Sequence, residues 1–193
     1  MSSQEITLLA ALICLALFAT IGIIDGFYLH LWQFKLYAHS ESRFEHQIHT
    51  IRAVLFPFIL YFLFVNNFGG WLLWLGVVFV VADLFTLAVD ALNEGDSRKF
   101  MGGLPKWEYV IHLFANGFHF ASIALVLAAK PLALWRFDSA ALAAPSNSIS
   151  LQWLAENLLP GAILLAALHV ALGIYPINQK WLELQSNIRC CYA

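Results

Sequence analysis

The sequence contains five long apolar runs, each of about the 20 residues that an α-helix needs to cross the hydrocarbon core of a bilayer. The runs lie at about 6–37, 43–66, 71–94, 105–129 and 151–176. With 61 % hydrophobic and 11 % charged residues, the composition is typical of a polytopic membrane protein and not of a soluble domain. The pattern predicts an all-α integral membrane protein with five transmembrane helices in a single domain, 1–193.

The basic residues predict the orientation of these helices. We call the end at which the first helix ends side A and the opposite end side B. Seven basic residues fall on side A: Lys35, Arg43, Arg98, Lys99, Lys106, Lys180 and Arg189. Two fall on side B, Lys130 and Arg136. By the positive-inside rule, side A and the C-terminus are cytoplasmic and the N-terminus is outside, in a membrane that we take to be a bacterial inner membrane.

The net charge of −2 gives no basis for nucleic-acid binding. None of the three cysteines has the spacing of a metal ligand, and the vicinal Cys190–Cys191 pair is expected to be free thiols in a reducing compartment.

Ionisable residues inside the predicted helices gather in the side-A half. They are Asp25 and His30; Glu45, His46, His49 and Arg52; Asp83, Asp90 and Glu94; Glu108, His112 and His119; and His169. At a rise of about 1.5 Å per residue, a first tier lies roughly 6–11 Å inside side A and a deeper one roughly 13–21 Å inside. Because such groups are costly in hydrocarbon, they are functional candidates by default.

Helical spacing places several of them on shared faces. The sets are Glu45 with His49, Glu108 with His112, and Asp83 with Asp90 and Glu94. Asp25 and His30 are five residues apart and do not share a face of an ideal α-helix, although Gly26 allows a local adjustment.

The charge balance of this half predicts a bound cation cluster. Six acids would be ionised there, whereas Arg52 is the one guanidinium expected inside the bundle. Each unpaired charge costs at least ~2.5–3.5 kcal/mol in hydrocarbon. Two divalent or trivalent metal ions would offset the acids. Mixed carboxylate and imidazole ligands suit iron, manganese or zinc.

In its ligand chemistry this half resembles the di-iron carboxylate four-helix bundles. The resemblance implies that helices one to four form an antiparallel four-helix bundle with a polar cytoplasmic half. The pairs Glu45-x-x-x-His49 and Glu108-x-x-x-His112 are one residue longer than the Glu-x-x-His motif of those proteins. The chain also lacks the histidine boxes of membrane desaturases, and only His46-x-x-His49 comes near them.

The leading hypothesis is a membrane-embedded di-metal oxidoreductase, with two iron ions, or manganese or zinc. It would act on a lipid-soluble substrate near the cytoplasmic face, with electrons from a donor protein or a larger membrane complex. The expected ligands are His30, Glu45, His49, Asp90, Glu108 and His112. The expected further ligands, or residues that hold the ligands in place, are Asp25, His46, Arg52, Asp83, Glu94, His119 and His169.

Other functions fit parts of this pattern. Tiers of acids and imidazoles are how proton or ion pathways are built. A b-type haem would take its axial ligands from His30, His49, His112 and His119. Zinc-dependent hydrolysis would use the same site, and an accessory subunit would use the polar half for contact.

Structural roles also compete for single residues. Ser42-x-x-Glu45 is a capping box, so Glu45 is a candidate cap of the second helix. Residues 96–99 are expected to form a solvated loop, and His169 is a candidate packing residue. For Asp83, His49, Asp90 and His112 the alternative is a structural network of salt bridges and hydrogen bonds with Arg52.

Overall fold

The computed structural model describes residues 1–139 and 148–190. Within these ranges it is all-helical, with 86 % helix and no β-strand, which confirms the predicted all-α class. Five helices are long and apolar enough to cross a membrane, as predicted. The expectation for the thiols of Cys190 and Cys191 falls outside the described side chains.

The long helices are α1 Ser3–Gly22 with its continuation η1 Ile23–Gln33, α2 Arg43–Ile59 with its continuation η3 Leu60–Val65, α3 Gly70–Ser97, α4 Lys106–Ala129 and α5 Ile149–Leu172. The shorter elements are η2 Leu36–Ala38, η4 Lys99–Met101, η5 Leu132–Trp135 and α6 Tyr175–Cys190. The third helix was predicted to end at 94, but it continues to Ser97, and this extra turn has consequences for the site.

Local sequence explains several helix features. At the start of α1, the Ser2 hydroxyl accepts a hydrogen bond from Glu5 N at 3.2 Å, and the Glu5 carboxylate accepts one from Ser2 N at 2.7 Å, which is a capping box. Two continuations are π-helices, in which the backbone bonds run from residue i to i+5. The second begins shortly after Pro57, whose missing N–H interrupts the α-helical ladder of α2.

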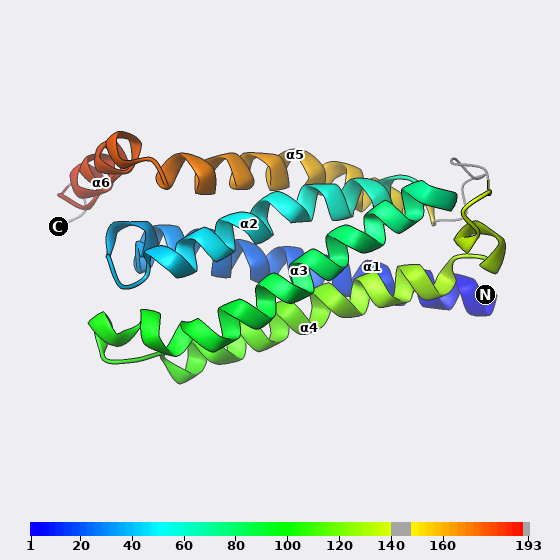
Figure 1. The fold of residues 1–193 in the computed structure, drawn as a ribbon, viewed down its shortest axis with the longest axis horizontal. Helices are drawn as coiled ribbons and strands as arrows, with labels where there is room; N and C mark the ends of the chain where they lie inside the picture. Colours follow the sequence, from blue (N-terminus) through cyan, green and yellow to red (C-terminus); the bar gives the residue numbers. More distant parts are fainter. Residues whose placement is uncertain (140–147, 191–193) are drawn as a thin grey trace.

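Successive long helices run in opposite directions along one axis, so that all five lie side by side (Figure 1). α1 packs against α4, and α2 packs against both α3 and α5. α5 also contacts α1, so the fifth helix closes one side of the bundle.

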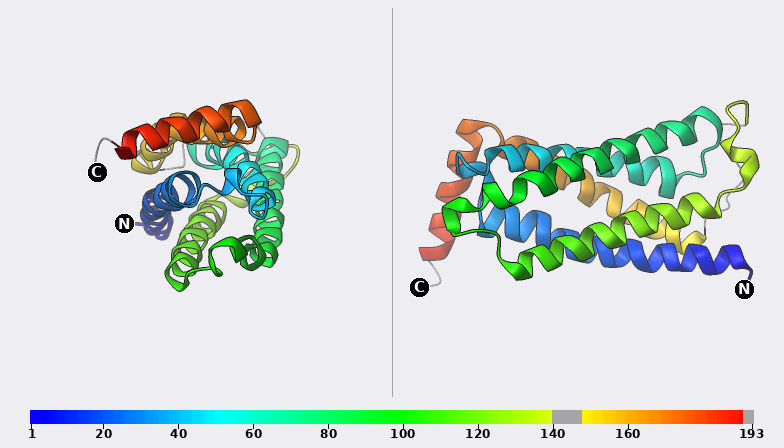
Figure 2. Two further views of the ribbon diagram at one scale, coloured as in Figure 1. Left: turned by 90° about the vertical axis from the view of Figure 1, so that its left-hand side faces the viewer. Right: turned by 60° about the horizontal axis from the view of Figure 1, so that its bottom comes forward.

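α6 lies across the side-A end of the bundle, at a large angle to the long helices (Figure 2). Trp181 of α6 meets Trp32 edge to face at 6.3 Å, and Gln185 Nε2 donates a hydrogen bond to Leu31 O at 3.4 Å. This helix was not predicted from the sequence.

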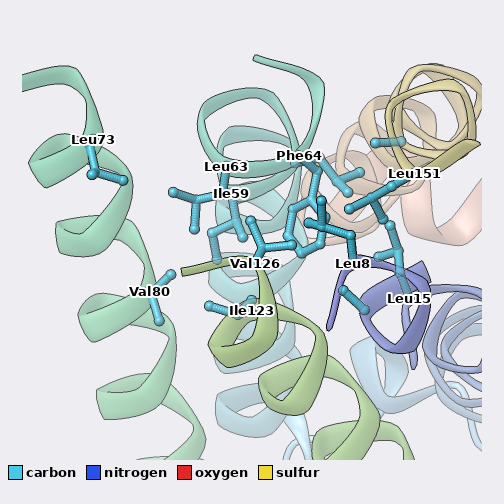
Figure 3. Packing of buried hydrophobic residues seen from close by; sticks show 13 residues of the cluster. Leu8, Leu15, Ile59, Leu63, Phe64, Leu73, Val80, Ile123, Val126 and Leu151 are labelled. Atoms are coloured by element: carbon cyan, nitrogen blue, oxygen red, sulfur yellow. The ribbon is translucent and has the colours of Figure 1, made fainter. Parts of the chain in front are cut away.

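The interior has two unlike halves. The half toward the N-terminus is filled by a cluster of buried apolar residues from all five long helices, including Leu15, Leu63, Val80, Val126 and Leu151 (Figure 3). The half toward side A holds most of the buried polar residues, which are His30, Glu45, His46, Asp83, Asp90, Glu94, Arg98, Glu108, His112, His119 and His169. The polar half that holds the site therefore adjoins a buried apolar cluster inside the bundle.

Candidate metal centre

Three histidines from three helices meet at the centre of the polar half. His30 comes from η1, His49 from α2 and His112 from α4. The Nε2 atoms of His30 and His112 are 3.1 Å apart, and the rings of His30 and His49 meet edge to face at 4.1 Å. Because α1 contacts α4 along its length, residues distant in sequence are brought to one point.

Asp25 joins His30 and His112 in a first group of donor atoms. Its Oδ1 lies 2.8 Å from His112 Nε2 and 3.5 Å from His30 Nε2. The three donor atoms lie within 4.8 Å of one another, so the group could hold a metal ion. Asp25 was predicted as a further ligand or a residue that holds the ligands in place, and the structure places it among the central donor atoms.

The π-helical geometry of η1 explains how Asp25 and His30 share a face. Residues five apart diverge on an α-helix but align in a π-helix, whose bonds run from i to i+5. The backbone follows this pattern to its end, where Phe34 N donates to Leu29 O at 2.8 Å. The local adjustment anticipated near Gly26 is therefore a whole π-helical segment.

A second group joins His30, Glu45 and His49, whose donor atoms also lie within 4.8 Å of one another. Glu45 Oε1 is 3.5 Å from His49 Nε2, as their i, i+4 spacing on α2 allows. Asp90 Oδ2 of α3 also lies close to this nitrogen of His49, at 3.3 Å. The two groups share His30 and form one continuous centre.

The arrangement fits metal ions in two respects. Donor atoms bound to one ion at about 2.0–2.2 Å lie about 2.8–3.6 Å apart in octahedral or tetrahedral geometry, and the contacts above have that length. Two buried carboxylate oxygens, Asp90 Oδ1 and Glu108 Oε2, also have no hydrogen-bond partner in the described structure. Asp25 Oδ1, Glu45 Oε1 and His49 Nε2 make the contacts with one another's groups given above. Because unsatisfied buried polar atoms are costly, a cation among them is a natural partner.

The position of Arg98 differs from the predicted one. It was expected in a solvated loop, but it is fully buried and lies between two carboxylates. Its Nη1 is 2.5 Å from Glu45 Oε2, and its Nη2 is 2.5 Å from Glu108 Oε1. The expected loop neighbours Asp96 and Lys99 are exposed, as predicted. Arg98 follows Glu94 by four residues, so extending the acidic stripe of α3 by one turn would have found it.

Two structural readings of the sequence are therefore wrong. Arg52 is not the one guanidinium inside the bundle, because Arg98 is buried there too. Glu45 does not cap α2: the Ser42 hydroxyl instead donates to Leu36 O at 2.7 Å, and the Glu45 carboxylate accepts from Ser97 and Arg98.

With both arginines counted, the net charge of the ionisable side chains in the polar half can be summed. The six carboxylates are Asp25, Glu45, Asp83, Asp90, Glu94 and Glu108, and the two guanidiniums are Arg52 and Arg98. If all are ionised and the imidazoles are neutral, four negative charges remain. Two divalent cations would neutralise them, whereas two trivalent ions would exceed them.

Glu94 supports the centre from α3. Its carboxylate forms a short contact with Nδ1 of His112, on the opposite side of the ring from Asp25. A carboxylate at the far nitrogen of a metal-binding imidazole fixes the tautomer and the ring orientation.

A second polar network lies deeper in the bundle. Arg52 Nε donates to Asp83 Oδ1 at 3.0 Å, and Arg52 Nη2 donates to Asn116 Oδ1 at 2.7 Å. His119 Nε2 lies 2.9 Å from Asp83 Oδ2. This network is part of the alternative expected around Arg52. Asp83 belongs to it, and Arg52 Nη1 lies 4.0 Å from Asp90 Oδ2, whereas His49 and His112 contact carboxylates of the centre.

His46 and His169 form a third pair, beside the centre. Their rings stack at 5.5 Å with an angle of 13° between the planes, and His46 Nε2 lies 3.2 Å from His169 O. His169, for which the sequence offered no partner on its own helix, thus packs against α2.

A cavity of about 570 Å³ adjoins the centre between α1, α2, α4 and α5. Its walls are mostly apolar, with residues such as Phe18, Phe56 and Leu165. Asp25 and His49 of the donor groups line it, and so does the Arg52 network. The cavity therefore connects residues of the donor groups with a mostly apolar space inside the bundle.

Comparison with protein-family models, curated proteins and solved structures gives no match for this chain. The functional conclusion therefore depends on the geometry of the site. That geometry places all six residues predicted as ligands within or next to one centre. They are His30, Glu45, His49, Asp90, Glu108 and His112.

Proposed function

We propose that this protein is a membrane-embedded oxidoreductase with a centre of two metal ions that oxidises a lipid-soluble substrate. The observation that carries the proposal is the pair of donor groups that meet at His30, beside two buried carboxylate oxygens, Asp90 Oδ1 and Glu108 Oε2, without a hydrogen-bond partner in the described structure. The four uncompensated negative charges support two divalent ions.

The ligands would be Asp25, His30, Glu45, His49, Asp90, Glu108 and His112. Because these are hard carboxylates and borderline imidazoles, with no thiolate among them, they suit iron, and also manganese or zinc. Arg98 would hold Glu45 and Glu108 in place and offset part of their charge. Glu94 would orient His112.

The chemistry we propose is oxygen-dependent. One O2, two electrons and two protons would convert a substrate C–H bond to C–OH and release one water. The two electrons come from an external donor, so a redox partner or a larger membrane complex is required. Redox-active metal ions would supply the site at which O2 is reduced.

We also propose that the five helices span the membrane with the N-terminus outside and the metal centre near the cytoplasmic face. The excess of basic residues on side A supports this orientation. The amphipathic α6 would then lie along the cytoplasmic surface of the membrane.

The competing functions receive less support. A proton pathway needs polar groups through the whole membrane, but the buried apolar cluster fills the other half of the described bundle. A haem needs a flat gap between its axial ligands, and the Nε2 atoms of His30 and His112 are only 3.1 Å apart.

Elemental analysis of the purified protein, together with its optical spectrum, tests the proposal. We expect about two iron or manganese ions per chain and no Soret band. Two zinc ions would support hydrolysis by the same site instead. A Soret band, or no metal after purification without chelators, would refute the proposal.

Substitutions locate the site independently. His49→Ala and His112→Ala should each lower the metal content, because both remove a buried ligand. His39→Ala is the control: His39 lies in the α1–α2 connection and stacks on Phe100 at 4.2 Å, outside the donor groups. The same metal content in all three variants would refute the assignment of His49 and His112 as ligands.

A further inference from the structure

The cavity beside the centre has a polar end at the donor groups, where Asp25, His49 and His169 line it. Phe18, Phe56 and Leu158 line the deeper part, together with the Arg52 network, whose polar groups are bonded to one another. A volume of about 570 Å³ falls in the range that holds a drug-sized molecule, so it suits one alkyl chain with a small head group better than a two-chain phospholipid.

The part of the cavity lining between the first and fifth helices includes small residues. They are Gly22 of α1, Gly26 of η1, and Gly161 and Ala162 of α5. Gly161 is exposed, and a Cβ atom added there would meet no atom within 4 Å. Since the outer face of this wall would contact lipid, a membrane-dissolved chain can enter here.

The charges around the cavity select the head group. Arg52, the cation of the lining, already donates to Asp83 and Asn116. With two divalent ions, ionised acids and neutral imidazoles, the charges of the polar half sum to zero. A carboxylate head would add a net negative charge to this buried site, and an ammonium head would add a net positive one, and both are costly.

We propose that the cavity binds a single-chain lipid with an uncharged, hydrogen-bonding head group, such as a long-chain alcohol or aldehyde, which enters between α1 and α5 at Gly161. The head lies at the polar end, so oxidation takes place at or near the carbon that bears it. This inference rests on the proposed function, because it takes the metal centre as the reacting end.

Binding to the metal-loaded protein in nanodiscs tests the head-group selection. The probes are radiolabelled dodecanol, dodecanoate and dodecylamine at neutral pH, which share one chain length. We expect dodecanol to bind at least about 10-fold more tightly than either charged probe, a difference of about 1.4 kcal/mol. Equal or tighter binding of dodecanoate or dodecylamine would overturn the inference.

A charge substitution tests the reason for that selection. Asp83→Asn keeps the size of the side chain but removes the closer of the two ion pairs of Arg52, leaving the 4.0 Å contact with Asp90. We expect dodecanoate to bind at least about 10-fold more tightly to this variant than to the wild type. Asp96→Asn, at an exposed carboxylate of α3, is the control and should change nothing. No gain of dodecanoate binding in Asp83→Asn would contradict the charge argument.

A glycine substitution tests the entry. Gly161→Leu should weaken dodecanol binding at least about 10-fold because the new side chain occupies the mouth of the cavity. Gly117→Leu is matched, since Gly117 is an exposed α4 glycine with equally open surroundings outside the cavity lining. Unchanged binding in Gly161→Leu would overturn the entry.

Metal content, measured on every sample, separates the two proposals. Wild-type protein without metal would refute the proposed function. Metal-loaded protein without the selectivity described above would refute this inference alone.

Discussion

Asp25 Oδ1 lies 3.5 Å from His30 Nε2, although the two residues are five positions apart in one helix. On an α-helix they would diverge by roughly 140°. In the π-helix Ile23–Gln33 they face the same way, and Asp25 Oδ1 also comes within 2.8 Å of His112 Nε2 on α4. The π-helix thus makes Asp25 a donor to the same point as two histidines, in keeping with the frequent use of such segments at functional sites.

Asp25→Asn tests this relationship. The substitution keeps the size of the side chain but removes the carboxylate charge of a residue that we propose as a ligand. We expect the metal content to fall to about half of the wild-type value or less, because the lost charge also offsets the cations. The measurement is metal per chain after dialysis. Asp96→Asn should retain full metal, and full metal in Asp25→Asn would show that its carboxylate is not a ligand.

Much of the fold could be predicted because long apolar runs and helical periodicity are visible directly in the sequence. Apolar runs of sufficient length identified the five long helices, and the rise per residue placed the ionisable groups in one half. The i, i+4 pairs of Glu45 with His49 and Glu108 with His112 then pointed to one centre. These inferences need only helical geometry.

The remaining features depend on departures from that geometry or on contacts between helices. The π-helix of η1 changes the period on which the face of Asp25 was judged. Arg98 was missed because polar residues after an apolar run resemble a loop, and its burial depends on Glu45 and Glu108 of other helices. α6 is short and polar on average, so no hydropathy signal marked it.

Arg98→Met should destabilise the protein by about 3–5 kcal/mol. The reason is that two buried carboxylates, Glu45 and Glu108, lose the charge that lies between them. The free energy of unfolding in detergent, from chemical denaturation, is the measurement. Arg98→Lys keeps the charge but not the forked geometry, so its loss should be intermediate.

The control for this substitution is the next residue. Lys99 is exposed and pairs with the exposed Asp96 at 2.8 Å, so Lys99→Met should change stability by less than about 0.5 kcal/mol. Similar losses in Arg98→Met and Lys99→Met would contradict the assigned role of the buried ion pairs.

Glu94→Gln should weaken metal binding about 10–100-fold without unfolding the protein. Glu94 contacts Nδ1 of His112, and its charge raises the basicity of the ring as a ligand. A titration of metal-free protein with Fe²⁺ or Mn²⁺ measures the affinity. Asn93→Gln, one residue earlier on α3, is the comparison, because Asn93 Nδ2 donates to Val89 O within its own helix. Equal affinities in the two variants would exclude the supporting role of Glu94.

We expect the stability of the protein to depend on pH because Lys130, at side B, is buried. It is 5 % exposed, its Nζ donates to Asn67 Oδ1 at 3.0 Å, and burial lowers its pKa from the ordinary value of 10.5 to about 8. Between these two pH values the unfolded chain holds a proton that the folded chain has lost. The free energy of unfolding should therefore rise as pH increases from about 8 to about 10.5.

Lys130→Met should remove this rise and stabilise the protein at pH 7, where the folded wild type buries a charged ammonium group. A difference of this size in pKa corresponds to about 3 kcal/mol, from which the lost hydrogen bond to Asn67 subtracts about 1 kcal/mol. Denaturation in detergent at several pH values measures it. Lys106→Met, at an exposed lysine, should keep the wild-type pH profile. If Lys130→Met also keeps that profile, the pH dependence does not arise from the burial of Lys130.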